Sequence, residues 1–332
     1  MLGRVARGKH GRQHLSRNEA ADALAALMQP QADPLQLGAF LIAQRIKGET
    51  PDELAGFVDA ARHTIPDFGQ FTHPNAVDLP CYAGKRRGAP IHLLAALQAR
   101  DRGIPVFIHT LGTIAERLTA AETLLATGLQ PAASLADADA QLQHDGIAWI
   151  EIADLCPPLA ALLALRPRLG VRSCAHTIAR LLNPLQCGGQ LNGFFHAPYG
   201  ERMAQVNRLL GQPRSLLFMG AEGEPELYAD RQKLLLMQQG DQDSVPLCYP
   251  DANTDPYPRQ ASTAATLLEA WHHAQSGHGT PREQAVLTRM AQGFDEVAGG
   301  GMEFSRRGFT AEMRRAREKG ACTVGRKPVG PV

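Results

Sequence analysis

The 332-residue chain has few aromatic residues, no long apolar run and no closely paired cysteines. Aromatics make up only 5% of the residues and do not alternate with basic ones, so stacking on single-stranded bases has weak support. No segment approaches the roughly 18 apolar residues of a membrane span. The cationic N-terminus also lacks the apolar segment of a secretory signal. We therefore expect a soluble, cytoplasmic protein with no membrane partner.

The cysteines are scattered along the chain without a CxxC pair. This spacing argues against a disulfide framework and against a zinc site. We expect reduced thiols, several of them in the core. The positions are Cys81, Cys156, Cys174, Cys187, Cys248 and Cys322.

The formal net charge is only +1, which by itself argues against a nucleic-acid partner. Its distribution is uneven: residues 1–18 contain five arginines and lysines and no acid, and residues 305–332 contain eight against two acids. The rest of the chain is therefore acidic overall. Basic ends on an acidic body form a local electrostatic footprint for a polyanion. Solvated charged tails are the alternative.

Helix signals dominate the first 65 residues. Ser16 lies three residues before Glu19 in a capping box, and Asp33 precedes Pro34 as an N-cap. Thr50, Pro51 and Glu53 repeat the pattern. Each predicted helix has an apolar stripe that needs a partner, so we expect a small bundle that also supplies a dimer surface.

After Pro66 short β-rich runs alternate with helical stretches. The runs AVDLP, IPVFIHTL, IAWIEIADL and RSLLFMG are separated by predicted helices such as 91–102 and 135–144. Such alternation predicts βαβ units and a mainly parallel sheet in an α/β fold. Ligands of these sheets bind at the carboxyl ends of the strands.

The stretch CYAGKRRGAP, residues 81–90, follows one of these strands directly. A glycine-rich turn after a strand offers backbone N–H groups to phosphate. Lys85, Arg86 and Arg87 add charges suited to a phosphate backbone but not to reading base sequence. A solvated loop surface is the alternative.

The segments LSRNEAADALAALM, from Leu15, and VRSCAHTIARLLNP, from Val171, resemble the anthranilate phosphoribosyltransferase (TrpD)-like family of nucleoside phosphorylase-like architecture. This resemblance implies a small helical domain of residues 1–70, completed by helices within 157–184. It implies a large α/β domain of residues 71–156 and 185–332 with a mainly parallel central sheet and a basic C-terminal segment. It also implies a homodimer formed through the helical domains.

The motifs that bind phosphoribosyl pyrophosphate and Mg²⁺ in this family are altered here. The family's GTGGD corresponds to residues 81–85, where a lysine replaces the aspartate, and its NISTA corresponds to PIHLL at 90–94. Its KHGNR corresponds to IHTLG at 108–112, and its acidic pair falls near EGEPE at 222–226. A lysine cannot bind Mg²⁺. We therefore expect no catalytic residues, no metal and no cofactor, and we expect the glutamates to orient nearby arginines.

The altered motifs resemble the YbiB-like branch of this family, which implies a homodimer that binds DNA or RNA with little sequence preference. The alternatives are a glycosyl- or phosphoribosyltransferase with a changed phosphate site and an acceptor other than anthranilate, and a small-molecule-binding or scaffold protein. Surface ion pairing for the arginines and a core role for His109 also stay open. The candidate nucleic-acid- and phosphate-binding residues are Lys85, Arg86, Arg87, His109, Arg166, Arg168, Arg172, Arg306, Arg307, Arg314 and Arg315.

Overall fold

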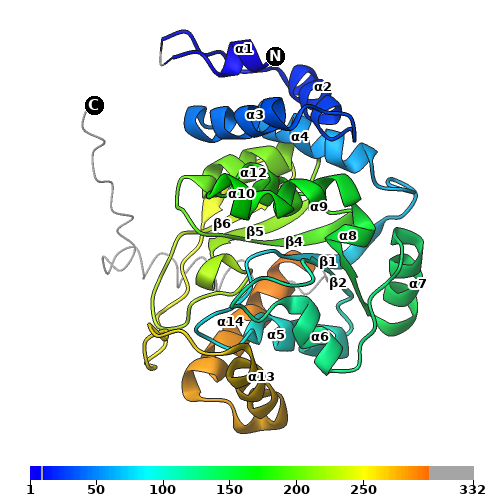
Figure 1. Cartoon of the computed structure of the whole chain (residues 1–332). Helices are drawn as coiled ribbons and strands as arrows, with labels where there is room; N and C mark the ends of the chain where they lie inside the picture. Colours follow the sequence, from blue (N-terminus) through cyan, green and yellow to red (C-terminus); the bar gives the residue numbers. More distant parts are fainter. Residues whose placement is uncertain (9, 299–332) are drawn as a thin grey trace.

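The computed structural model describes residues 1–8 and 10–298, and it is built on one seven-stranded sheet in the order β3-β2-β1-β4-β5-β6-β7 (Figure 1). Strands β1 to β5 pair in parallel, and β6 and β7 add an antiparallel edge. The strands are β1 (His73–Cys81), β2 (Val106–Thr110), β3 (Ile147–Glu151), β4 (Cys187–Phe194), β5 (Arg214–Met219), β6 (Leu235–Gln239) and β7 (Val245–Pro246). The prediction of an α/β fold with a mainly parallel sheet is confirmed.

The parallel register brings the carboxyl ends of the central strands to one edge. Cys81 at the end of β1 pairs with Thr110 at the end of β2, and Phe194 at the end of β4 pairs with Met219 at the end of β5. The loops after these strands therefore converge, as expected for the ligand-binding edge of such a sheet.

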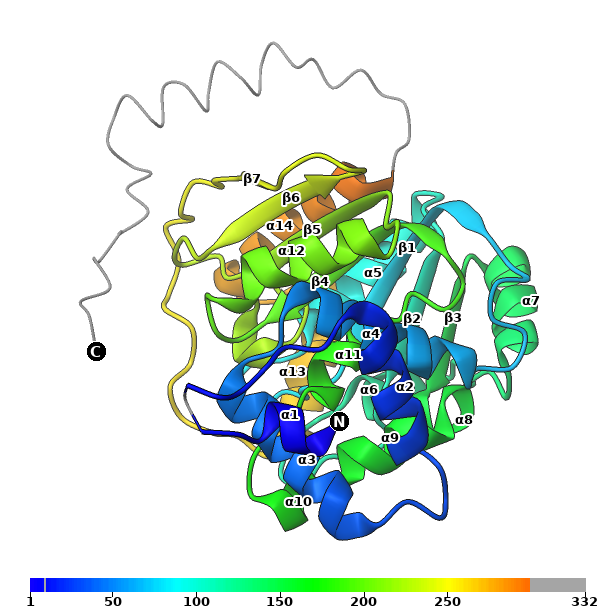
Figure 2. The same ribbon diagram turned by 90° about the horizontal axis from the view of Figure 1, so that it is seen from above.

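The N-terminal helices form a separate layer over one face of the sheet (Figures 1 and 2). They are α1 (Leu2–Val5), α2 (Arg17–Leu27), α3 (Pro34–Lys47) and α4 (Pro51–His63). The predicted caps are confirmed: Ser16 and Thr50 form capping boxes, and the Asp33 carboxylate accepts from two backbone N–H groups. Helix α4 lies against α2 and α12, which joins this layer to the sheet.

The remaining helices cover both faces of the sheet. On one face α12 packs against β5 and β6, and on the other α14 packs against α5 and β4. The buried apolar residues form two cores, one on each face of the sheet. Leu217 of β5 belongs to the core on the side of α12, and its neighbours Leu216 and Phe218 belong to the core on the side of α14. Side chains alternate between the two faces along a strand, which explains this division. These helices are α5 (Ile91–Asp101), α6 (Ala120–Ala126), α7 (Leu135–Asp145), α8 (Ile152–Leu155), α9 (Pro157–Ala164), α10 (Arg166–Leu169), α11 (Ala175–Ala179), α12 (Tyr199–Leu209), α13 (Ala264–His273) and α14 (Pro281–Ala298).

The helices after β3 return to the N-terminal layer. Arg62 of α4 donates hydrogen bonds to the carbonyl oxygens of Leu181 and Leu182, and Arg45 of α3 donates to the carbonyl of Arg172. The domain boundaries proposed from the sequence stay a prediction. Within the part of the chain that is described, no helix is both long and apolar enough to cross a bilayer. Four predicted binding residues, Arg306, Arg307, Arg314 and Arg315, lie outside the described residues.

A buried ion pair connects α3 and α4 with the segment that leads into α2. Lys47 Nζ lies 2.6 Å from Glu53 Oε2, and both side chains are almost fully buried. The backbone N–H of Leu15 donates to the same carboxylate at 2.9 Å. Burial alone would raise the pKa of Glu53, but the hydrogen bonds from Lys47, Leu15 and Thr50 lower it below the ordinary value.

We predict that Glu53→Gln lowers the free energy of unfolding by about 3 kcal/mol at pH 7, because it leaves the Lys47 ammonium buried without a counter-charge. A carboxylate with a lowered pKa stabilises the fold above its unfolded-state value, about 4.3, and loses that effect as the pH falls. Urea unfolding should therefore show the difference from wild type shrinking below about pH 4.

The matched control is Asp295→Asn, which removes an exposed ion pair to Arg102. This change should cost less than about 1 kcal/mol. Equal losses for the two variants would contradict a special role of the buried pair.

Candidate functional site

Two loops meet at the carboxyl edge of the sheet: residues 82–88 after β1, and residues 220–226 after β5. Glycines allow the close approach. A Cβ on Gly193 of β4 would lie 2.5 Å from the carbonyl oxygen of Glu224, and a Cβ on Gly220 would lie 1.8 Å from the same atom. Side chains at these positions would push the second loop away from the strand ends.

Carboxylates of the second loop accept hydrogen bonds from the backbone of the first. Glu224 Oε1 accepts from the N–H of Ala83 at 2.8 Å and also from the N–H of Gly84. Glu222 accepts from the N–H groups of Arg86 and Arg87, each at 3.0 Å. The N–H groups that the sequence assigned to phosphate therefore bind two internal carboxylates instead.

Glu222 is held in an unusual backbone conformation, with φ of 60°. For a residue other than glycine this left-handed conformation is uncommon and costs free energy unless neighbouring contacts fix it. Here the hydroxyl of Tyr257 donates to the Glu222 carboxylate at 2.7 Å. The conformation directs the side chain at the first loop, where an anion would otherwise bind.

Lys85 does not lie where the sequence analysis expected. Its ammonium is 2.5 Å from Glu226 Oε1, and each side chain is only 1% exposed. Burial alone would raise the pKa of Glu226, but Lys85 and a hydrogen bond from His92 lower it to about 2. The ammonium that the sequence assigned to a phosphate backbone is therefore buried against a carboxylate in this structure.

Arg86 and Arg87 are more exposed than this buried pair. The Arg86 guanidinium is about half exposed and lies 3.1 Å from the exposed carboxylate of Glu116. Arg87 is 3.7 Å from Glu222 and its guanidinium carbon is 5.6 Å from the centre of the Tyr257 ring. The expectation that the glutamates orient nearby arginines agrees with the contact between Glu222 and Arg87. The three cations of the loop, Lys85, Arg86 and Arg87, do not form one exposed surface, because Lys85 is buried.

His109 is a core residue on β2. Its Nδ1 lies 2.6 Å from the Tyr82 hydroxyl and its Nε2 lies 3.1 Å from Asp78 Oδ1, and the side chain has no exposed surface. It cannot contact phosphate from there, so its assignment as a binding residue is corrected. The hydrogen-bonded core role that the sequence left open is the observed one.

A group of arginines adjoins the two loops. Arg166 in α10 and Arg172 in the following loop come from the segment singled out in the sequence, whereas the sequence analysis missed Arg117 and Arg180. Burial and the three neighbouring arginines lower the pKa of Arg172 to about 10. Arg172 still carries its charge at neutral pH, so the cluster is a region where an anion would relieve repulsion. Arg168 is exposed on the same short helix.

The remaining neighbours of this arginine cluster (Arg117, Arg166, Arg172 and Arg180) include an uncharged histidine and an exposed ring. Burial and the arginines lower the pKa of His176 to about 3, so this side chain is neutral at pH 7. Phe195, which follows β4, is 49% exposed. A Cβ on Gly223 would lie 3.7 Å from Phe195 Cβ and 3.9 Å from Arg172 Nη1, so Phe195 and Arg172 border the same glycine.

Residues 1–65 match the family described as "Glycosyl transferase family, helical bundle domain". The chain is 31% identical over 273 residues to "Uncharacterized protein YbiB" of Escherichia coli (strain K12), covering 80% of this chain and 84% of the relative. The chain belongs to the TrpD-like family. An anthranilate phosphoribosyltransferase of Methylocella silvestris is 30% identical over 68% of this chain and 63% of its own length.

Solved structures of TrpD-like proteins have the same fold. The anthranilate phosphoribosyltransferase of Thermus thermophilus superposes with a TM-score of 0.74 at 20% identity, covering 90% of this chain and 89% of that one. The Saccharomyces cerevisiae enzyme in complex with PRPP and Mg gives 0.65 at 14% identity, with 94% of each chain covered. At these identities the likeness establishes the fold, and the site must be judged on its own residues.

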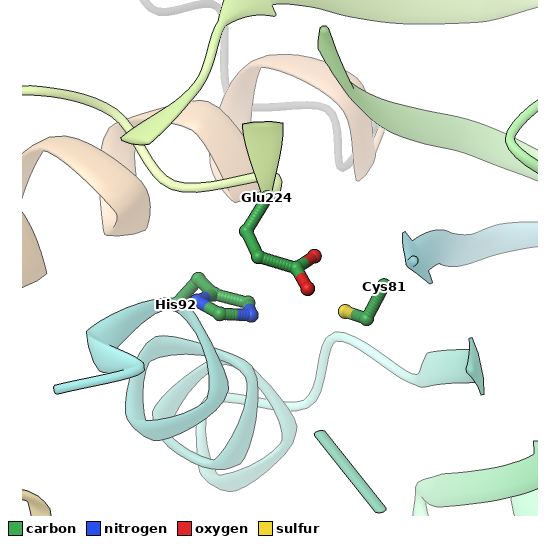
Figure 3. A group of neighbouring side chains, drawn as sticks. All are labelled: Cys81, His92 and Glu224. Carbon is green, nitrogen blue, oxygen red and sulfur yellow. The ribbon is translucent and has the colours of Figure 1, made fainter. Parts of the chain in front are cut away.

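The residues of this TrpD-like site do not fit phosphoribosyl pyrophosphate with Mg²⁺. The loop N–H groups already bind Glu222 and Glu224, and the lysine is paired with Glu226. Beneath the loop, Cys81, His92 and Glu224 point toward one another (Figure 3). A thiol and an imidazole are poor ligands for Mg²⁺, which prefers oxygen.

We predict that Lys85→Met lowers the free energy of unfolding by about 3 to 5 kcal/mol, because the Glu226 carboxylate is left buried without its partner. Arg86→Met removes the adjacent but exposed cation and should cost less than about 1 kcal/mol. Urea unfolding of both variants measures the difference.

The double variant Lys85→Met with Glu226→Gln should recover much of the loss, since it removes both charges of the pair. If Lys85→Met were no more destabilising than Arg86→Met, the buried pair would not be what fixes this loop.

Proposed function

We propose that this protein is a non-enzymatic, sequence-tolerant nucleic-acid-binding homodimer on a TrpD-like scaffold. The proposal concerns the arginine cluster and the exposed Phe195 rather than the loop of residues 82–88. Backbone phosphates would bind the arginines, and an unpaired base would stack on the phenyl ring.

The observation that carries the proposal is that two arginines of the cluster, Arg166 and Arg172, have no paired carboxylate in the described part of the chain, whereas Arg117 lies 3.7 Å from Glu222. Among the described residues, neither Arg166 nor Arg172 has a carboxylate within salt-bridge distance, while all three nearby glutamates are engaged with the first loop. Guanidinium groups bind phosphate through paired N–H donors and make no demand on base sequence. A phosphate chain is therefore a suitable partner for this cluster.

The alternative is a glycosyl- or phosphoribosyltransferase with a changed phosphate site and an acceptor other than anthranilate. It is supported by the relatives that are named anthranilate phosphoribosyltransferase. The occupied loop N–H groups and the buried Lys85 weigh against it, because a small pyrophosphate substrate would lose both its donors and its metal.

The homodimer is proposed through helix α3. Leu35 and Ile46 are 82% and 74% exposed, and together with Ala39 and Ile42 they follow helical spacing along one side. The homodimer that the sequence resemblance implies makes a second copy of this chain the proposed partner for this stripe. Pairing would remove two large aliphatic side chains per chain from water.

We predict that wild-type protein binds oligonucleotides of unrelated sequence with similar affinity, and that this affinity falls about a thousandfold from 50 to 200 mM salt if roughly six phosphates are contacted. Arg166→Ala with Arg172→Ala should weaken binding to all sequences and reduce the salt slope by about 2. Fluorescence anisotropy with single- and double-stranded DNA and RNA measures both quantities.

The control with the same loss of charge is Arg100→Ala with Arg102→Ala, at the end of α5 away from the site, which should leave binding unchanged. Absence of binding to any oligonucleotide at low salt would contradict the proposal. A rise in melting temperature with phosphoribosyl pyrophosphate and Mg²⁺ but not with oligonucleotide would favour the transferase. A ligand present at 100 times its Kd raises the free energy of unfolding by about 2.7 kcal/mol, which is enough to detect.

We predict that Leu35→Glu with Ile46→Glu converts the dimer to a monomer, because it places charges at both ends of the apolar stripe, on its two most exposed large side chains. Light scattering coupled to size-exclusion chromatography should show the mass fall from twice the chain mass to the chain mass. Leu125→Glu, at an exposed leucine of α6, should leave the mass unchanged. A wild-type monomer at micromolar concentration would contradict the dimer.

A further inference from the structure

The buried group of Cys81, His92 and Glu224 contains two polar atoms without a protein partner, and a thiol whose one printed contact is a weak 3.6 Å hydrogen bond to the carbonyl oxygen of Leu79. One atom from each side chain lies within 4.8 Å of the others, and the side chains point toward one another (Figure 3). The Nε2 of His92 and the Oε2 of Glu224 are buried without a hydrogen-bond partner among the described residues. Unpartnered buried polar atoms cost free energy, so two of them facing one thiol indicate an absent ligand.

Each potential ligand is oriented by a second contact. His92 Nδ1 lies 3.1 Å from Glu226 Oε2, which directs the Nε2 lone pair into the group when Nδ1 carries the proton. The other oxygen of Glu226 binds Lys85 at 2.5 Å. Glu224 Oε1 is held by the N–H groups of Ala83 and Gly84, which leaves Oε2 free to face the group. A carboxylate behind a histidine is the usual support of a zinc ligand.

The spacing and donor types suit a small divalent ion of intermediate softness. Tetrahedral zinc, with bonds of about 2.0 to 2.3 Å, separates its ligand atoms by roughly 3.3 to 3.8 Å, so atoms that lie within 4.8 Å of one another need to approach by up to about 1.5 Å. Thiolate, imidazole and carboxylate together favour Zn²⁺ over Mg²⁺ or Ca²⁺. A thiolate and a carboxylate also neutralise the charge of the ion.

We propose that Cys81, His92 and Glu224 bind a Zn²⁺ ion beneath the loop of residues 82–88. Binding displaces the thiol proton of Cys81 to solvent and forms a Zn–S bond, with zinc unchanged in oxidation state. Because the ligands come from the end of β1, the first turn of α5 and the loop after β5, the ion joins the two loops that border the arginine cluster.

The fourth position of the zinc would be taken by water or by another small ligand. Without the cation, burial and the nearby Glu224 raise the pKa of Cys81 well above its ordinary value, so the thiol keeps its proton. The inference does not depend on nucleic-acid binding, because zinc content can be measured on the protein alone.

The test measures zinc by inductively coupled plasma mass spectrometry on untagged protein purified from zinc-supplemented cells and dialysed. We expect about one zinc per chain in wild type and at least about tenfold less in Cys81→Ser and in Glu224→Gln. Cys174→Ser, at another buried cysteine, is the matched control and should retain the metal. Equal zinc content in all variants, or none in wild type, would overturn the proposal.

A second measurement covers variants that fail to fold. Wild-type protein stripped with a chelator should regain melting temperature when Zn²⁺ is added, and Co²⁺ should give the visible absorption of a thiolate-bound tetrahedral ion. Glu226→Gln, which alters the group behind His92, should lower zinc affinity about 10- to 100-fold. If neither ion changes the melting temperature of the stripped protein, the site does not bind metal.

Discussion

The carboxyl edge of this protein depends on the contact between the carboxylates of residues 222–226 and the backbone of residues 82–88. Glu222 and Glu224 accept the loop N–H groups, and Glu226 neutralises Lys85 and accepts from the N–H of His92 at the start of α5. These are the donors that a phosphate group would use in a glycine-rich loop. In this structure these donors are therefore paired within the protein.

Because of this internal pairing, the TrpD-like fold of the chain does not by itself indicate what the loop of residues 82–88 binds. The sheet, the helical layer and the glycines that permit close approach of the loops are all present. What differs is the sign and type of a few side chains: a lysine after Gly84, a histidine in the first turn of α5 and glutamates that point inward. Positive charge that could meet an external anion lies instead on the arginines beside α10, where no carboxylate in the described chain pairs with Arg166 or Arg172.

The fold was predictable because the signals for its helices and strands are local in the sequence. The site was not predictable, since its contacts join residues that are distant in the sequence. Capping boxes at Ser16 and Thr50, and the short β-rich runs after Pro66, are visible over a few residues and are confirmed. The partners of the first loop lie about 140 residues away, so three adjacent cations look like one exposed surface in the sequence. All five residues of β2 are buried, so His109 lies in the core on a strand covered on both faces, and only tertiary contacts bring Arg117, Arg180 and Phe195 to Arg172.

The separation of contacting residues in the sequence also explains why the spacing of the cysteines did not predict the proposed metal-binding group. Spacing rules detect ligands that one turn or one hairpin supplies, such as CxxC. Here the group is assembled from a strand end, a helix start and a loop across the sheet, and its histidine is oriented by a carboxylate that also holds the buried lysine. Glu226 thus links ion pair and metal-binding group, so that a change of charge at Lys85 is transmitted to His92. The sequence assigns the loop of residues 82–88 to an external phosphate. In the structure this loop covers a buried polar group in which the carboxylates of residues 222–226 pair with the loop's own donors.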